Sequence, residues 1–165
     1  MTTRLDQLKS DLATAQKSKA DAEEKKTEIK ENLEKLKDKR NRFRFAKDGL
    51  VPKVNRAISE LENVSSATSN ASAKLTSGLK TDSKDDSSQI RNVKTVATRA
   101  ISIKSALTKA LNDFKKELEK VEKLVEEEGQ KLRRIENKIG SLEAEIAKIK
   151  AEIESLEAAQ STGRS

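Results

Sequence analysis

The sequence predicts an all-α protein, a long antiparallel helical hairpin of the coiled-coil type. Charged residues make up 38% of its 165 residues and aromatic residues only 2%, with five Gly and one Pro. This composition is typical of long helices. Two runs of apolar residues also follow a seven-residue repeat, and a polar segment separates them at the chain midpoint. We therefore expect a single hairpin domain over residues 1–165.

The first arm is expected over about residues 3–77. Its apolar positions alternate in steps of three and four, which predicts a coiled-coil seam rather than a globular helix face. Thr3 and Asp6 are spaced to cap the start of this helix. The expected seam consists of Leu5, Leu8, Leu12, Ala15, Lys19, Ala22, Lys26, Ile29, Leu33, Leu36, Arg40, Phe43, Lys47, Leu50, Val54, Ala57, Leu61, Val64, Thr68, Ala71 and Leu75.

Gly49 and Pro52 interrupt this arm. A proline inside a helix removes one N–H donor and clashes with the preceding turn, at a cost of about 3 kcal/mol. The arm could break here and fold into a shorter bundle, or it could continue with a kink. The seam keeps the same phase on both sides, which favours the kink. Antiparallel pairing places residue i opposite about 165 − i, so Leu111 and Phe114 should lie opposite this site.

The turn is expected over about residues 78–87 and the second arm over about residues 88–160. Gly78 suits the residue after a helix end, and Asp86 suits a helix N-cap. The second seam is the cleaner of the two. It consists of Ile90, Val93, Ala97, Ala100, Lys104, Leu107, Leu111, Phe114, Leu118, Val121, Val125, Glu128, Leu132, Ile135, Ile139, Leu142, Ile146, Ile149, Ile153 and Leu156.

Several apolar residues of the central region fall outside both seams. They are Val51, Ile58, Leu79, Val96, Ile101, Ile103 and Leu124. Isolated exposed apolar residues are common on proteins. Val96, Ile101 and Ile103 lie close together in the sequence, however, and this favours packing against a partner helix or a second copy of the chain.

The positive charge is concentrated in one segment. Residues 35–56 contain nine basic and two acidic residues, and the rest of the chain contains 26 of each. Phe43 lies on the seam and is expected in the core. Phe45 lies off the seam, so Arg42, Arg44, Phe45 and Lys47 are the expected contact residues. They would suit an acidic protein, an anionic membrane surface or a nucleic acid.

The chain has no His and no Cys, so thiolate nucleophiles, His-based relays and disulfides lack their parts. We expect no catalytic residue, no cofactor and no metal site. The acidic segment 82–86 does not start an EF-hand calcium loop, because Ser87 and Val93 stand where such a loop needs Gly and Glu. No apolar stretch is long enough to span a membrane. The first ten residues, MTTRLDQLKS, lack the apolar stretch of a signal peptide. A cytoplasmic location, or export without a cleavable signal, is expected.

Three segments carry a resemblance at the level of architecture. They are the polar heptad arm LDQLKSDLATAQKSKADAEEKKTEIKENLEKL, the middle NVSSATSNASAKLTSGLKTDSKDDSS and the ending IENKIGSLEAEIAKIKAEIESLEA. In this order of segments the chain resembles the small helical proteins encoded beside LXG toxins of Gram-positive type VII secretion systems. It lacks their Trp-x-Gly turn and has no Tyr for the usual export signal. The resemblance implies a protein that binds the helical targeting domain of a toxin.

These observations predict a non-enzymatic coiled-coil interaction protein, an adaptor or targeting chaperone that binds partner helices. The expected partner-binding residues are Val96, Ile101 and Ile103 for helix packing, with Arg42, Arg44, Phe45 and Lys47 for an acidic or phosphate-bearing surface. The alternative is a nucleic-acid-binding structural protein that uses residues 35–56.

Overall fold

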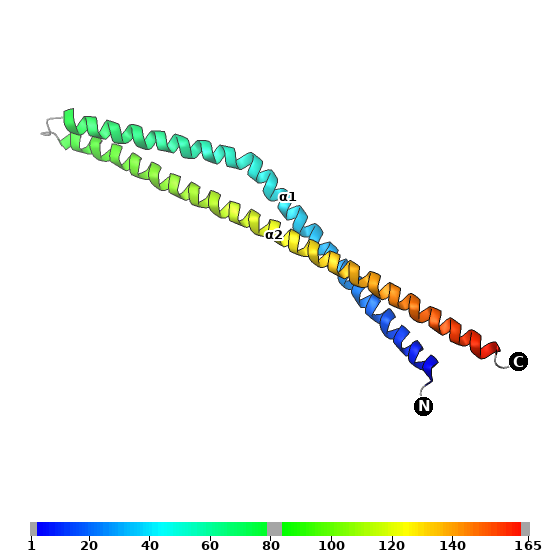
Figure 1. The fold of residues 1–165 in the computed structure, drawn as a ribbon. Coiled ribbons are helices and arrows are strands. Elements are labelled where there is room, and N and C mark those ends of the chain that lie inside the picture. The colour runs from blue at the N-terminus through cyan, green and yellow to red at the C-terminus, as the bar shows by residue number, and fades with distance from the viewer. Residues whose placement is uncertain (1–2, 79–83, 163–165) are drawn as a thin grey trace. The chain divides into compact units, whose positions relative to one another are not determined.

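The computed structural model describes residues 3–78 and 84–162, and these form two helices (Figure 1). Helix α1 spans Arg4–Gly78 and helix α2 spans Lys84–Thr162. The helices pack against each other as a helical hairpin, and the described residues contain no strand. The predicted all-α hairpin is therefore confirmed.

Two details of the predicted turn are wrong. Gly78 is the last residue of α1 and does not have a positive φ, so it does not form the expected left-handed residue after the helix. Helix α2 begins at Lys84, which places Asp86 inside the helix rather than at its N-cap. Leu79, one of the predicted off-seam residues, lies outside the described residues.

The start of α1 carries the predicted cap. The Thr3 backbone N–H and hydroxyl both donate to the Asp6 carboxylate, at 3.1 and 2.5 Å, and the Asp6 N–H donates to the Thr3 hydroxyl at 3.2 Å. This reciprocal pair satisfies N–H groups that have no partner within the helix. The hydrogen bonds from Thr3 lower the pKa of Asp6 below its ordinary value of 3.8.

The chain divides into two compact units, each built from both helices. Unit 1 comprises Met1–Asp38 with Glu122–Ser165, and unit 2 comprises Lys39–Val121. Helix pairing in each unit is antiparallel. Lys19 pairs with Glu143 at 2.9 Å in unit 1, and Glu62 pairs with Lys104 in unit 2. Both partners lie within three residues of the positions that the pairing rule gives.

The seam of unit 1 is as the heptads predict. Its buried apolar residues are Leu8, Ala15, Ala22, Leu33, Ile139 and Ile153, all of them seam positions. The two seam lysines lie at the edge of this core and pair with glutamates of the opposite helix: Lys19 with Glu143 at 2.9 Å, and Lys26 with Glu136 at 3.2 Å. The hydrogen bond with Glu143 raises the pKa of Lys19.

The seam of α1 in unit 2 departs from the prediction. Helix α2 buries or half-buries every predicted seam position from Ile90 to Leu156. In α1, however, Leu50 and Val64 are exposed, while the next residues, Val51 and Ser65, face the core. One of the two seam series therefore moves forward by one residue after Phe43. The full shifted series is Val51, Ile58, Ser65 and Ser72, in place of Leu50, Ala57, Val64 and Ala71.

The shift has a simple geometric form. Between Phe43 and Val51 the core series advances by eight residues instead of seven, which is two steps of four in place of a four and a three. Beyond Val51 the core positions again alternate in steps of three and four. Two consecutive steps of four form a stutter, which locally unwinds a coiled coil. The prediction of an unbroken seam across Gly49 and Pro52 is therefore wrong, and Val51 and Ile58 belong to the packed face.

Pro52 lies inside α1, which continues through it, so the alternative of a broken arm is wrong. Pro52 has no N–H to donate to the carbonyl of Asp48, and helices commonly bend where a proline removes this bond. The α1 ribbon bends in its cyan part within unit 2 (Figure 1). The stutter and the proline thus lie within about three turns of helix.

Val51→Ala and Val64→Ala form a matched pair that tests the shifted seam. Val51 is half-buried and Val64 is 43% exposed, whereas the regular heptad places Val64 in the core. We expect Val51→Ala to lower the free energy of unfolding by about 1 kcal/mol and Val64→Ala to change it by less than about 0.5 kcal/mol. Urea unfolding followed by circular dichroism measures both, and a larger loss at Val64 would restore the unshifted seam.

Candidate functional site

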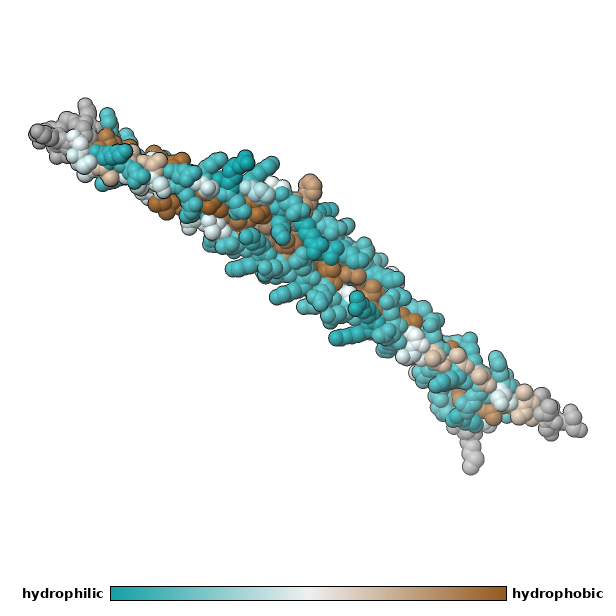
Figure 2. Space-filling model, turned by 45° about the horizontal axis from the view of Figure 1, so that its top comes forward, coloured by the Kyte–Doolittle hydropathy of each residue, from teal (hydrophilic) through white to brown (hydrophobic). Residues whose placement is uncertain are grey.

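One side of unit 2 carries apolar residues beside the core. With the shifted seam at positions a and d, the g positions of both helices are apolar over this region, and most of their side chains are exposed. We call this surface the apolar flank. It consists of Leu50, Ala57, Val64 and Ala71 on α1 and Val96, Ile103 and Ala110 on α2. Figure 2 shows brown hydrophobic residues between teal ones along one face of the protein.

The other side of unit 2 is mostly polar. It is formed by the e positions Asn55, Glu62, Ser69, Lys94, Ile101 and Thr108, which we call the polar flank. Two surface hollows show that g positions of α1 lie beside g positions of α2, and that e positions lie beside e positions. One is lined by Leu50 and Ala110 among others, and the other by Glu62 and Ile101. Apart from Ile101, the apolar residues beside the core are therefore gathered on one side.

The described part of unit 1 has no comparable surface. Its g positions are polar except for Leu124, which is 44% exposed. The others are Arg4, Asp11, Ser18, Lys25 and Asn32 on α1 and Lys131, Lys138, Glu145 and Glu152 on α2. Polar residues on both sides of a two-stranded seam are typical of a coiled coil that is complete by itself. A helix with apolar residues at a, d and g is instead typical of a larger bundle.

The apolar flank contains a pocket at the stutter. This pocket has a volume of about 170 Å³ and is lined entirely by apolar residues: Leu50, Val51, Val54, Leu107, Ala110, Leu111 and Phe114. Leu111 and Phe114 are the residues predicted to lie opposite Pro52. Small-molecule sites commonly measure 300 to 1,000 Å³, so a space of this size suits a single bulky side chain better than a cofactor.

The three apolar residues predicted to bind a partner do not form one cluster. Val96 and Ile103 lie on the apolar flank, whereas Ile101 lies on the polar flank near Glu62 and Lys104. All three are exposed, Ile101 by 56% and Ile103 by 51%. Residues two apart on a helix point in nearly opposite directions, so closeness in sequence did not place Ile101 beside Ile103.

The two phenylalanines of α1 lie as predicted. Phe43 is half-buried and stacks on Phe114, with ring centroids 5.4 Å apart and an interplanar angle of 27°. The Lys39 ammonium lies 6.0 Å from the centre of the Phe43 ring. Phe45 is 84% exposed and lies on the outer face of α1. The pair Phe43–Phe114 is thus part of the core, and Phe45 is not.

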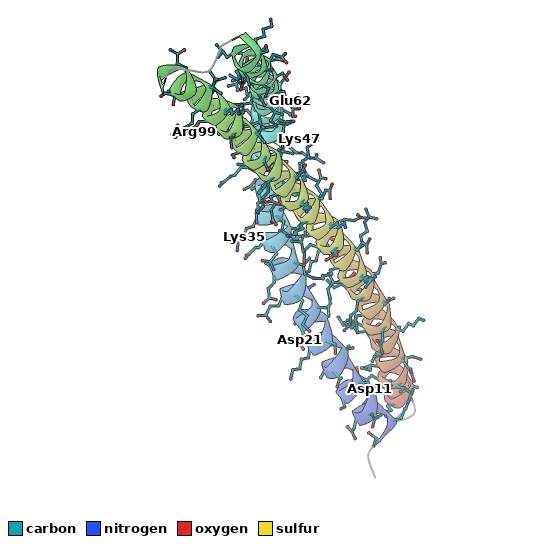
Figure 3. All side chains as sticks on the ribbon, turned by 90° about the vertical axis from the view of Figure 1, so that its left-hand side faces the viewer. Asp11, Asp21, Lys35, Lys47, Glu62 and Arg99 are labelled. Carbon is teal, nitrogen blue, oxygen red and sulfur yellow. The ribbon has the colours of Figure 1, made fainter. Side chains whose placement is uncertain are left out.

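The basic residues of unit 2 lie on both helices. Arg42, Arg44 and Lys47 are exposed on α1. A second basic stretch, which was not predicted, lies on α2 from Arg91 to Lys116, with seven basic residues and one acidic residue, Asp113. Unit 2 as a whole contains 18 basic and nine acidic residues, a net charge of +9, while unit 1 has 17 and 19, a net charge of −2. Figure 3 shows charged side chains projecting from both helices, with Lys47 and Arg99 labelled.

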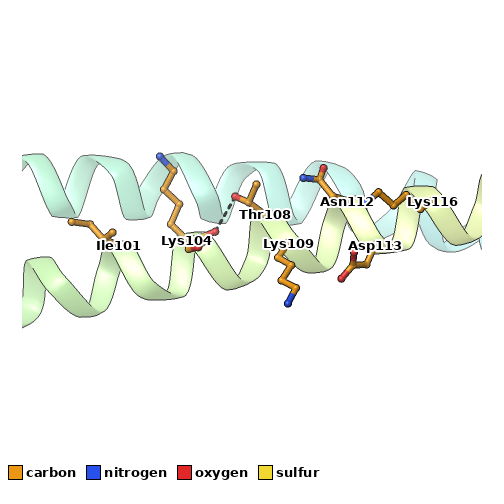
Figure 4. Close-up of a pocket in the computed structure, with 8 residues that line it drawn as sticks. Ile101, Lys104, Thr108, Lys109, Asn112, Asp113 and Lys116 are labelled. Atoms are coloured by element: carbon orange, nitrogen blue, oxygen red, sulfur yellow. Dashed lines mark hydrogen bonds between the residues drawn. The ribbon is translucent and has the colours of Figure 1, made fainter.

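A further hollow on unit 2 is an open surface of one helix. It is lined only by α2 residues: Ile101, Lys104, Ser105, Thr108, Lys109, Asn112, Asp113 and Lys116 (Figure 4). The Thr108 hydroxyl donates to the Lys104 carbonyl at 2.9 Å, and the Lys104 ammonium is paired with Glu62. No second element closes over this surface, so it does not enclose a ligand.

Within residues 3–78 and 84–162 there is no group of three or more acidic side chains placed to hold a metal ion. In the same part of the chain, neither helix has a stretch apolar enough to cross a membrane. The sequence matches no protein-family model, and neither a curated protein nor a solved structure is significantly similar to it.

Proposed function

We propose that this protein is a non-enzymatic adaptor that binds a partner helix on the apolar flank of unit 2. The observation that carries the proposal is the series of exposed apolar g positions in this unit, on both helices and on one side, whereas unit 1 has Leu124 as its one apolar g position among the described residues. A partner helix laid along the flank would contact α1 and α2 together and form a three-helix core. Amphipathic helices commonly bind grooves of this kind through residues spaced three and four apart.

The composition of the core supports the same proposal. Small residues fill the part of unit 2 nearest the turn, with Ala97, Ala100 and Ser72 buried and Ser65 and Thr68 half-buried. Such a core removes little apolar area from water, and burial of apolar area is the main source of stability. Covering the flank with another helix would add the burial that this half of the hairpin lacks. The targeting helices of an LXG toxin, which the resemblance implies, are one candidate of this kind.

Ile103→Ser and Ile101→Ser test this proposal as a matched pair. The probe is a fluorescein-labelled 21-residue helical peptide with a leucine stripe and glutamine at its other positions, titrated with the full chain and followed by fluorescence anisotropy. We expect Ile103→Ser to raise the Kd at least about tenfold, since burial of an isoleucine contributes about 1.5 kcal/mol or more. Ile101→Ser, on the opposite flank, should change it by less than about twofold.

The two substitutions remove the same side chain from the same helix at similar exposure, so their effects on helix stability should match. Circular dichroism of both variants checks this. Equal weakening by the two changes, or no binding by the unmodified chain, would contradict the proposed function.

A further inference from the structure

We infer that the partner of the apolar flank is an acidic amphipathic helix that inserts one bulky apolar side chain into the pocket at the stutter. This inference rests on the proposed function and adds the chemistry of the partner. The pocket opens on the apolar flank, because Leu50 and Ala110 belong to both. It therefore lies on the path that a helix bound along this flank would take.

The size and lining of the pocket define the anchor. Its volume of about 170 Å³ and its lining by seven apolar residues fit a leucine, methionine or phenylalanine side chain. A polar anchor would lose its hydrogen bonds with water and find none in return. Bulky apolar side chains in closed central pockets commonly dominate the energy of helix binding.

Charge defines the rest of the partner. The c positions, which lie next to g on the helix surface, carry three basic residues beside the apolar flank, Lys53, Lys74 and Arg99, and two acidic residues, Glu60 and Asp113. Further basic residues lie on the outer faces of both helices, and unit 2 has a net charge of +9. Arg99 follows Val96 by three residues and precedes Ile103 by four, so it lies beside both on the α2 surface. Glutamate or aspartate on the bound helix would be attracted by the net positive charge of unit 2 and would lie within reach of Lys53, Lys74 and Arg99.

The same charges argue against a second copy of the chain on this surface. Two copies of unit 2 would bring two net charges of +9 together. Complementary potentials favour association and like charges disfavour it. An acidic helix satisfies both the apolar and the charged parts of the surface.

Three labelled 21-residue peptides with the same leucine stripe test the inference. Their other positions carry glutamate, glutamine or lysine. At about 0.15 M salt we expect the glutamate peptide to bind the full chain at least tenfold more tightly than the lysine peptide, with a smaller ratio at 0.5 M salt because ions screen exposed charges. Equal affinities would overturn the acidic partner. If the glutamine peptide still bound the unmodified chain, and bound the Ile103→Ser variant more weakly, the proposed function would hold without the acidic partner.

Ala110→Leu tests the pocket. The longer side chain at its mouth should occupy the space of the anchor and weaken binding of the glutamate peptide at least tenfold. Ala73→Leu is the matched control, since Ala73 is exposed on α1, points away from the apolar flank and lines none of the hollows described above. We expect it to change the affinity less than twofold. Unchanged binding by Ala110→Leu would overturn the anchor.

Two further measurements test whether a second copy of the chain or a nucleic acid binds the apolar flank instead. Sedimentation of the full chain should show a monomer, and a dimer that is lost in Ile103→Ser would assign the flank to a second copy. A labelled 20-base-pair DNA duplex should not displace the glutamate peptide. Submicromolar DNA binding that competes with this peptide would make nucleic acid the partner and overturn the inference.

Discussion

Val121→Asp should lower the free energy of unfolding by at least about 3 kcal/mol. Val121 lies on the α2 seam in unit 2 and is only 2% exposed. A carboxylate at this position would be removed from water and would replace the packing of the valine, which costs several kcal/mol unless the group takes up a proton. Urea unfolding followed by circular dichroism measures the loss.

Val64→Asp is the control for this change. It introduces the same side chain into the same unit, at a position that is 43% exposed. We expect a loss of less than about 1 kcal/mol, close to the helix propensity of aspartate. Similar losses in the two variants would contradict the assignment of Val121 to the core and Val64 to the surface.

Phe114→Ala should lower the free energy of unfolding by about 2 kcal/mol. Truncation of a buried phenylalanine commonly costs 3 to 5 kcal/mol, and Phe114 is only half-buried. The variant also loses the stacking of Phe114 on Phe43, for which paired rings commonly contribute about 1 kcal/mol.

Phe45→Ala provides the comparison, because Phe45 is 84% exposed in the same unit. The same truncation there should change the free energy of unfolding by less than about 0.5 kcal/mol. If Phe45→Ala cost as much as Phe114→Ala, Phe45 would belong to the packed face, and the outer position found for it would be wrong.

The sequence predicted the seam of α2 almost completely, but beyond Phe43 it predicted only one of the two seam series of α1, that of Val54 and Leu61. Along α2 one phase holds from Ile90 to Leu156, and from Leu132 onward every seam position is Ile or Leu. In α1 the neighbours Leu50 and Val51, and again Ala57 and Ile58, are both apolar. Either phase then gives an apolar residue at these two positions, and further along the regular phase gives Val64 and Ala71 where the shifted one gives Ser65 and Ser72. Packing against α2, and not the apolar pattern, decides between them. The sequence pattern alone could not reveal the shift.

The candidate site was predictable in part for the same reason. Val96 and Ile103 were predicted off the seam because α2 keeps its phase. Leu50 and Val64, their counterparts on α1, were predicted in the core because the shift was not visible. The positive charge was predicted only for residues 35–56, since the α2 stretch 91–116 joins it only when the helices pair. A separate count of the basic and acidic residues of each helix, in place of one count over the whole chain, would have revealed this second stretch.

The binding of a helix to the apolar flank is tested most directly by paramagnetic broadening. A nitroxide is attached to the middle of the leucine stripe of the glutamine peptide, and the amide signals of the isotope-labelled full chain are recorded with the label oxidised and reduced. Binding to the apolar flank predicts selective broadening around Val64, Val96 and Ile103. Broadening centred on Glu62 and Ile101, or on residues 4–38 of unit 1, would contradict it.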